Sequence, residues 1–312
     1  MAVVLSVVGQ LARDHTTFTA LLMYVPVPLV AAWAIVADVA CRGRAIRRAR
    51  FGLSVISLAL TGWWTLDRVG QSPDTPPRPD DLVVLHWNVL WGGLEPPAAE
   101  GWRGIMDAVA ERRPDVVVLS EAPGDASIRQ LLTRLGPTWR AVTYASLPDV
   151  AYRFNLVIAA RGSVSEVARH TIPSGRALLA AVAVDGRALR VLAVDGESQW
   201  WLDRTPRLHV VAQILATETR VGQPIDVVAG DFNAVGQSVG FEAVRRLGYT
   251  DAARHCRAWR ATWPARVPLF DIDKIWLSPA WRVSGGGLFA NPASDHRGTI
   301  IRLRRATSGG GA

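Results

Sequence analysis

The chain begins with long apolar runs and continues, from Leu82 onward, with short apolar runs that alternate with amphipathic stretches. The short runs are rich in Val and Ile, which is typical of buried β-strands. The amphipathic stretches repeat apolar residues every three or four positions and predict helices, so the mixture indicates an α+β domain. The predicted strands are Val83–Trp87, Val116–Leu119, Arg140–Tyr144, Leu156–Ala159, Leu178–Val184, Ala188–Val194, Asp226–Ala229, Lys274–Leu277 and Thr299–Leu303, and the predicted helices are Gly101–Arg112, Ala126–Leu135, Arg207–Arg220 and Val239–Leu247.

Residues 1–71 are apolar enough to predict a helical transmembrane anchor. Thr16–Ala40 supplies the roughly 20 apolar residues that one span requires, and membrane helices tolerate the two prolines inside it. Phe51–Leu66 is a second span, about 24 Å long as a helix. Met1–Ala12 is too short to span alone, so it is the remnant of a third span, an interfacial segment, or the result of a start site placed too late. The alternative is a buried helical hairpin in a soluble core.

The charged segment between the two apolar runs predicts the orientation of the chain. Five arginines lie within Arg42–Arg50, and positively charged loops remain in the cytoplasm. The second span then leaves the cytoplasm, so we expect a multi-pass protein of the plasma membrane with an extracytoplasmic domain. Residues 72–81 are a Pro-rich linker, residues 82–305 form the domain, and residues 306–312 are a disordered tail.

Polar motifs follow four of the apolar runs, at the points where the predicted strands end. They are His86-Trp87-Asn88, Ser120-Glu121, Gly230-Asp231-Phe232-Asn233 and Ser294-Asp295-His296. Loops at strand ends commonly carry the chemistry of a rigid scaffold. Carboxylates, amides and a histidine that converge there indicate a hydrolytic site built around a hard metal ion.

The order of these motifs resembles that of the endonuclease/exonuclease/phosphatase superfamily, which has the DNase-I-like fold. Ile272-Asp273-Lys274-Ile275 and Thr262-Trp263-Pro264 also fit the family pattern, and the resemblance covers Leu82 to Leu303. It implies a four-layer α/β/β/α sandwich with the active site at one end. It also implies a Mg²⁺-dependent (or Mn²⁺-dependent) phosphoric ester hydrolase of the phosphodiesterase or phosphatase class.

The resemblance also implies roles for individual residues. Glu121, Asn88 and Asp295 would hold the metal ion, directly or through its water shell. Asp231 would orient the attacking water or accept its proton, and Asn233 would hold a phosphate oxygen. His296 would contact the phosphate, while Asp273 would fix its tautomer and stabilise its charged form. We expect a structural role for His86, on the interpretation that its side chain points away from the neighbours of Asn88.

Two positions depart from the family pattern. Leu90 stands where the family often has an acidic residue, so one metal contact is missing. The family usually has a phosphate-binding histidine after the strand that ends at Val194, and here Asp195 follows instead. Asp195 binds a second cation or a substrate hydroxyl, or this loop is rearranged.

Composition adds little to the choice of substrate. The net charge is +8 and the pI is near 10.5, which would fit a nucleic-acid-binding protein. From Leu82 onward, however, there are 27 basic and 21 acidic residues and no basic run, so this argument for DNA is weak. The two cysteines, Cys41 and Cys256, permit no disulfide framework or zinc motif.

We therefore expect a membrane-tethered phosphoester or phosphoanhydride hydrolase. An anchor followed by this domain resembles the membrane-anchored bacterial members associated with glycopeptide resistance, which implies lipid-linked phosphate or pyrophosphate substrates. Two alternatives remain, a membrane-anchored nuclease and a catalytically impaired binding module. The missing histidine near Asp195 favours the module, whereas the intact Glu121, Asp231 and His296 oppose it.

Overall fold

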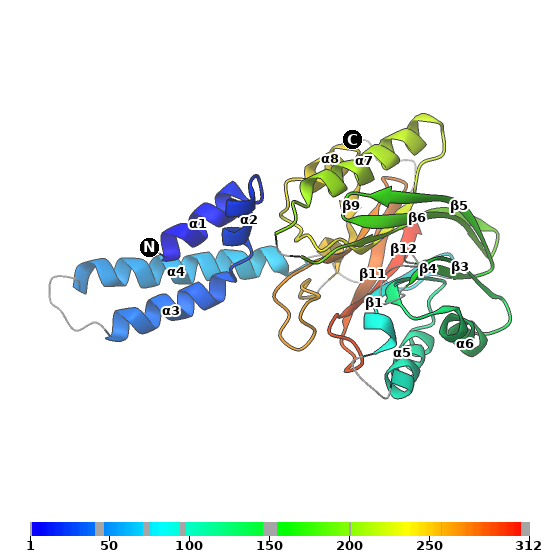
Figure 1. Cartoon of the computed structure of the whole chain (residues 1–312), viewed down its shortest axis with the longest axis horizontal. Coiled ribbons are helices and arrows are strands. Elements are labelled where there is room, and N and C mark those ends of the chain that lie inside the picture. The colour runs from blue at the N-terminus through cyan, green and yellow to red at the C-terminus, as the bar shows by residue number, and fades with distance from the viewer. Residues whose placement is uncertain are drawn as a thin grey trace.

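The computed structural model places a two-sheet sandwich at one end of the molecule and a group of helices at the other (Figure 1). The structure describes residues 2–40, 47–70, 75–93, 98–145, 155–199, 201–256 and 258–306.

The domain contains two mixed sheets of six strands each. Within each sheet one pair of neighbouring strands is parallel, β1 with β2 and β7 with β8, and the other pairs are antiparallel. In spatial order, the first sheet comprises β11 (Trp281–Phe289), β12 (Gly298–Arg305), β1 (Leu82–Asn88), β2 (Val116–Ala122), β4 (Asn155–Arg161) and β3 (Trp139–Ala145). The second comprises β5 (Ser163–Ile172), β6 (Gly175–Val184), β7 (Arg187–Gly196), β8 (Val227–Asp231), β10 (Asp273–Leu277) and β9 (Thr250–Asp251).

Helices flank both sheets and complete the layers. Helices α5 (Ala98–Glu111) and α6 (Asp125–Leu135) lie against the first sheet, and α7 (Thr205–Arg220) and α8 (Phe241–Arg246) lie against the second (Figure 1). Two short 3₁₀ segments, η2 (Leu90–Gly92) and η3 (Ala252–His255), interrupt the loops. This confirms an α+β fold of two mixed sheets flanked by helices.

The central strands are apolar on both faces because both faces are covered. Val84 and Val118 contribute to the core between the sheets, whereas Leu85 and Val117 pack toward α5 and α6. Alternate side chains of a strand point to opposite faces, so burial on both sides requires a continuous apolar run. This is why these strands are recognisable in the sequence.

The apolar region at the front of the chain forms four helices, and one expectation about it is corrected. Thr16–Ala40 is broken into α2 (Thr17–Met23) and α3 (Val27–Ala40). Among the described residues, no helix taken alone has both the length and the apolar character to cross a bilayer. Thr17–Met23 and Val27–Asp38 have them only as a pair, bent by 69°. The break contains Pro26, which cannot continue a helix, and Pro28 stands in the first turn of α3, where a proline is tolerated.

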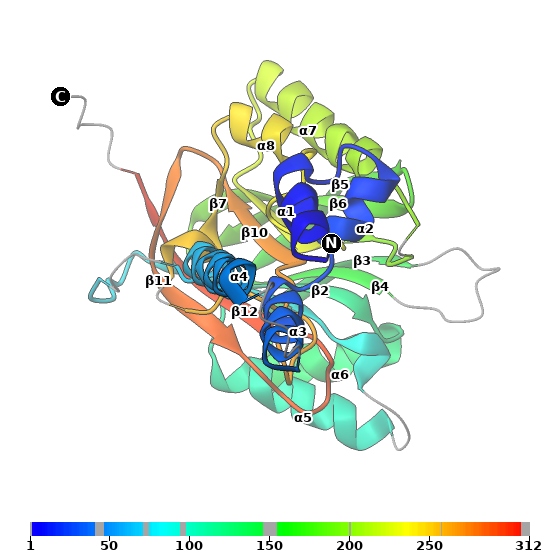
Figure 2. The same ribbon diagram turned by 90° about the vertical axis from the view of Figure 1, so that its left-hand side faces the viewer.

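The other two helices are α1 (Ala2–Ala12) and α4 (Arg47–Arg68), which contains the second apolar run. Figure 2 shows the four helices in front of the end of the sandwich. Residues 41–46, which hold part of the arginine-rich link, lie outside the described residues. Residues 307–312 of the predicted tail also lie outside them. The predicted orientation across a membrane therefore stays a prediction.

The N-terminal helices make direct contacts with the domain. In α4, the ring of Trp64 lies 5.6 Å from that of Trp259, and the backbone amide of Arg260 donates to the carbonyl of Arg68 at 2.9 Å. Part of the Pro-rich segment also packs on the domain, because the amide of Thr75 donates to the carbonyl of Ser284 on β11.

Candidate active site

Several strands end or begin at the same end of the sandwich, and this brings the polar motifs together. In the first sheet, Asn88 at the end of β1 is paired with Ser120 of β2. In the second sheet, Asp231 of β8 is paired with Asp195 on one side and with Asp273 on the other. The registry of the strands thus gathers side chains from distant parts of the sequence.

A buried carboxylate and histidine form the centre of this site. The carboxylate Oδ2 of Asp273 lies 2.8 Å from Nδ1 of His296, and the two residues are 3% and 6% exposed. Although burial lowers the pKa of His296, the charge of Asp273 and their hydrogen bond raise it to about 10. Burial likewise raises the pKa of Asp273, yet the charge of His296 holds it below the usual value for an aspartate. The pair is therefore an ion pair at neutral pH.

His86 contacts the other oxygen of the same carboxylate, and the expectation for its orientation is corrected. Its Nε2 lies 3.1 Å from Oδ1 of Asp273, and its Nδ1 faces the carbonyl of Val118 at 3.3 Å. His86 and Asn88 are two residues apart on one strand, so their side chains share a face. His86 is fully buried and holds Asp273 from the side opposite His296.

Glu121 and Asn88 contact each other beside the pair. A register shift in β2 between Leu119 and Ala122 contains Glu121, whose φ of 48° lies in the left-handed region that non-glycine residues rarely adopt. The amide Nδ2 of Asn88 donates to Oε1 of Glu121 and to Oδ2 of Asp231, each at 3.0 Å. Burial raises the pKa of Glu121 despite the bond from Asn88. A strained backbone at such a residue fits a functional position.

Asp231 is the last residue of β8, and Asn233 lies in the loop that follows. Burial, followed by the charge of Asp273, raises the pKa of Asp231 well above its ordinary value. The backbone amide of Asn233 donates to Oδ1 of Asp231 at 2.8 Å, and its side-chain amide donates to the carbonyl of Gly196 at 2.7 Å. The φ of Asn233 is 46°, a conformation that asparagine tolerates better than most residues.

The loop before β12 is fixed to β1, which positions His296. Ser294 donates through Oγ to the carbonyl of Asn88 at 2.7 Å, and the indole of Trp87 donates to the carbonyl of His296 at 2.9 Å. Trp263 donates to Oδ2 of Asp295 at 3.0 Å. The other oxygen of Asp295, Oδ1, is buried and accepts no hydrogen bond from the described residues.

The donor set fits a hard divalent cation. Carboxylate oxygens of Glu121, Asp231 and Asp295 are the ligand type that Mg²⁺ and Mn²⁺ prefer. Asn88 turns its amide Nδ2 toward Glu121 and Asp231, and its Oδ1 accepts from the backbone amide of Leu90, so in this structure Asn88 orients the two carboxylates. Burial raises the pKa of Glu121 and of Asp231, which is the effect that a bound cation would oppose. Asp295 Oδ1 accepts no hydrogen bond from the described residues and lies 3.9 Å from Nε2 of His296, so it offers a further oxygen at this place. Ligand atoms of Asp231, Asp273 and His296 also lie within 4.8 Å of one another, but His296 is already bonded to Asp273.

Asp195 does not stand free at the position of the family's usual histidine. Its Oδ2 accepts from Nη2 and Nε of Arg176 at 2.8 and 3.1 Å, and both residues are less than 10% exposed. This ion pair lines a cleft of about 330 Å³ together with Glu121 and Asn233. Arg176 and Asp195 meet through the register of the hairpin that joins β6 and β7 at Asp185-Gly186.

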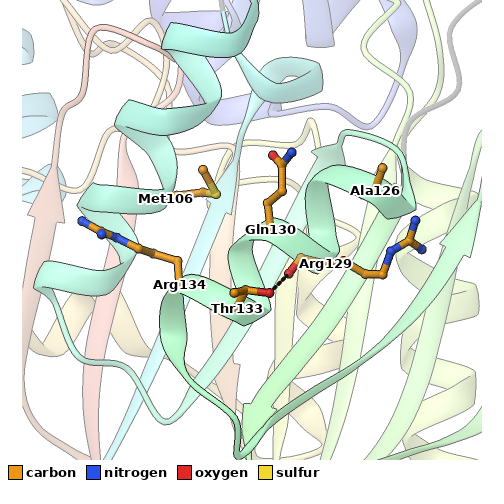
Figure 3. A pocket seen from close by; sticks show the side chains of 6 residues that line it. All are labelled: Met106, Ala126, Arg129, Gln130, Thr133 and Arg134. Atoms are coloured by element: carbon orange, nitrogen blue, oxygen red, sulfur yellow. Dashed lines mark hydrogen bonds between the residues drawn. The ribbon is translucent and has the colours of Figure 1, made fainter.

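Another hollow, between α5 and α6, lacks the chemistry of the site. It has a volume of about 550 Å³ and no carboxylate or histidine in its lining. Figure 3 shows its residues on the two helices, Met106, Ala126, Arg129, Gln130, Thr133 and Arg134. The cluster at the strand ends is therefore the candidate active site.

The domain, with its two mixed sheets and this cluster at one end, has a phosphoester hydrolase fold. The model of the family described as "Endonuclease/Exonuclease/phosphatase family" matches residues 85–296, and the chain belongs to this family. Comparison with curated proteins gives no match.

Solved structures of this fold are similar to the chain at low identity. The human Nocturnin catalytic domain with bound sulfate is 19% identical, with a TM-score of 0.58, covering 75% of this chain and 97% of that one. A mannosyl-6-phosphatase of Bacteroides thetaiotaomicron is 15% identical, with a TM-score of 0.57 and coverage of 72% and 99%. TDP2 of D. rerio, complexed with a single-strand DNA product, is 22% identical, with a TM-score of 0.53 and coverage of 72% and 99%. These likenesses establish the fold alone.

Proposed function

We propose that the protein is a divalent-metal-dependent hydrolase of phosphoesters or phosphoanhydrides, tethered to the membrane with its domain extracytoplasmic. The observation that carries the catalytic part is the buried ion pair of Asp273 and His296, which lies beside Asp231 and Glu121. An enzyme that had lost its chemistry would have little reason to keep such a costly buried arrangement. This argument opposes the alternative of a binding module.

Glu121, Asn88 and Asp295 are the residues that we assign to Mg²⁺ or Mn²⁺, and Asp231 adds negative charge beside them. The cation, when bound, stabilises negative charge that develops on the phosphate oxygens.

The remaining steps belong to side chains of the chain. Asp231 is assigned to the attacking water. Its raised pKa brings the carboxylate closer to the range in which it can accept a proton from that water. His296 is charged and presents its second ring nitrogen, Nε2, away from Asp273, so it can donate to a phosphate oxygen. Asn233 is assigned to a phosphate oxygen, with one of its amide protons already held by Gly196.

Exposed apolar side chains support the membrane tether. On α3, Leu29, Trp33 and Val36 are more than 60% exposed, and on α4 Val55 and Leu66 are similarly exposed. Apolar surface on this scale is unusual in a soluble monomer and is typical of a membrane contact. Tethering also favours a phosphate or pyrophosphate carried on a lipid, because the local concentration of such a substrate is high at the bilayer. The proposed arrangement is the one implied by the resemblance of the sequence to glycopeptide-resistance-associated members of the superfamily.

Metal-dependence assays on the full-length chain test the enzymatic proposal. Protein stripped with EDTA should be inactive and should recover with Mg²⁺ or Mn²⁺ on bis-p-nitrophenyl phosphate or on a lipid diphosphate. His296→Ala should abolish the recovered activity, whereas His209→Ala, an exposed histidine on α7, should not. Preferential cleavage of plasmid DNA would favour the nuclease instead, and metal-independent turnover would contradict the proposal.

A reporter fusion tests the tether and its orientation. A reporter enzyme that is active only outside the cytoplasm, fused after Ala312, should be active in cells. Activity of a cytoplasmic reporter at the same position would show that the predicted orientation is wrong.

A further inference from the structure

The cleft that contains the catalytic residues has a second wall that the chemistry does not use. It has a volume of about 510 Å³, and Asp231, Asn233 and His296 lie on one side of it. One apolar wall comes from the C-terminal end of helix α2 and from the segment before β10, and its residues are Leu21, Tyr24, Trp263, Phe270 and Ile272. Leu90 and Trp91 of η2 also line the cleft, as do Glu121, Ser198, Arg204 and Asp295.

We propose that this wall is a binding subsite for the hydrocarbon chain of the substrate, with Leu21 and Tyr24 of the N-terminal region as specificity-determining residues. The ligand class is a phosphate or diphosphate attached to a long apolar chain. The inference rests on the proposed function and deepens it, because it makes the front helices part of the active site and not only an anchor.

The contribution of α2 is fixed by bonds to the catalytic loop. Asp14, before α2, accepts hydrogen bonds from Ser238 Oγ and from the amide of Val239, the latter at 2.7 Å. The hydroxyl of Tyr24, after α2, accepts from the amide of Val235 at 3.3 Å. Since Val235 is two residues beyond Asn233, both ends of α2 are attached to the loop that carries Asp231 and Asn233.

The packing around Tyr24 joins the two halves of the apolar wall. The ring of Tyr24 lies 5.9 Å from that of Phe270, which in turn lies 5.9 Å from the stacked ring of Trp263. Buried Met23 packs with Val235 and Ile272 behind this surface. The wall is therefore continuous, and it ends at Ile272, the residue directly before β10 and Asp273.

Charge in the cleft suits an amphipathic anion. The guanidinium of Arg204 lies 4.9 Å from the ring of Tyr24 and donates through Nε to the carbonyl of Asn233. A positive side chain thus stands between the apolar wall and the catalytic loop. A small soluble phosphate would use Arg204 and the catalytic residues but would leave the apolar wall in contact with water, which is unfavourable.

The apolar surface of the wall continues outward onto the exposed helices. Leu21 is 40% exposed, although it lines the cleft, and Val25 is 41% exposed just after it. Leu29 and Trp33 follow on α3 with exposures of 61% and 62%. A chain that entered from the bilayer could remain in contact with apolar side chains along this path until its phosphate reached His296.

Binding of non-hydrolysable phosphonates tests the subsite without requiring turnover. Full-length protein in phosphatidylcholine vesicles is titrated with dodecyl phosphonate and with methyl phosphonate, and binding to empty vesicles is subtracted. The wild type should bind the dodecyl compound at least about tenfold more tightly, since each methylene in an apolar pocket contributes a severalfold preference. Leu21→Ser should remove most of this preference and leave methyl phosphonate binding unchanged.

A matched variant separates the subsite from general membrane partitioning. Leu11→Ser removes an equally apolar side chain that is 76% exposed on α1 and does not line the cleft, so it should keep the wild-type preference. Equal affinity of the wild type for the two phosphonates would overturn the inference, and so would equal losses in Leu11→Ser and Leu21→Ser. Failure to hydrolyse any phosphate compound would instead contradict the proposed function, while the binding result would still decide the subsite.

Discussion

Replacement of Asp273 by asparagine probes the centre of the site with little change in shape. The new amide would retain a polar contact to His296 but would lack the negative charge that holds the imidazolium. Because both residues are almost fully buried, water cannot take over the role of the carboxylate. The variant therefore asks whether the charge of Asp273 makes His296 effective.

The expected magnitude follows from the pKa of His296. A tenfold change in an acid dissociation constant corresponds to about 1.4 kcal/mol. A rise of the pKa from 6.5 to about 10 therefore corresponds to roughly 5 kcal/mol in favour of the charged form, most of it from Asp273 at 2.8 Å. Without that charge, burial lowers the pKa of His296, and only the more distant carboxylates of Asp231 and Asp295 still raise it. We expect kcat/KM to fall by about 10² to 10⁴-fold, the usual range for a lost acid–base group.

A double-mutant cycle measures whether the two residues act as one unit. The cycle needs kcat/KM for the wild type, Asp273→Asn, His296→Ala and the double variant on one substrate, with His209→Ala as the surface control. The double variant should be hardly worse than His296→Ala, because residues that act together are strongly non-additive. If the two losses multiply instead, Asp273 acts independently of His296 and the reasoning from their ion pair is refuted.

Three further predictions concern the surroundings of this pair. Glu121→Gln should abolish Mg²⁺-dependent activity and Mg²⁺-induced thermal stabilisation with the fold intact. Glu111→Gln, at an exposed glutamate, is the control. Unchanged Mg²⁺ binding in Glu121→Gln would remove Glu121 from the metal site. His86→Ala should lower the free energy of unfolding by about 2–4 kcal/mol, because Asp273 loses a buried partner at 3.1 Å. For the same reason it should lower kcat more than it raises KM. A normal kcat in a destabilised protein would limit the role of His86 to packing. In metal-free protein, the stability lost in His296→Ala should be largest below pH 6.5 and should decline as pH rises through about 10, until only the lost packing of the buried ring remains. Urea unfolding measures this loss, and a loss independent of pH would exclude the ion pair as its cause.

The convergence of Asn88, Glu121 and Asp231 could be expected because each stands at or near the end of an apolar run that is buried on both faces. His296 instead lies in the loop before β12, two residues from the start of that strand. The α+β character followed from the same runs. The strand ends then had only to meet, and the register of β8 with β10 brings Asp231 opposite Asp273.

The structural elements that sequence reasoning missed lack such a signal. β5 lies at a sheet edge and exposes much of its surface, so Ser163–Ile172 carries Glu166 and Arg169 and reads as polar. β11 contains Gly285–Gly287, which have low strand propensity, and its strand character depends on pairing with β12.

Contacts between elements far apart in the sequence could not be predicted either. Arg204 and Tyr24 reach the catalytic loop from separate parts of the chain, and only the three-dimensional structure joins them. His86 could have been placed correctly, because a residue two positions before Asn88 on a strand shares its face. The prediction failed there through the wrong use of strand periodicity rather than for lack of information.

The opposite pKa directions of Asp231 and Asp273 explain why two paired aspartates can serve different roles. The histidine Nδ1 lies 2.8 Å from Asp273 but 3.9 Å from Asp231, so only Asp273 gains a direct bond to a positive charge. Asp273, further held by His86, stays ionised, whereas burial and the charge of Asp273 raise the pKa of Asp231. Environments that separate the pKa values of neighbouring acids commonly divide their catalytic roles. This difference supports the proposed roles, in which the carboxylate bonded to His296 orients the imidazole and Asp231 exchanges a proton with water.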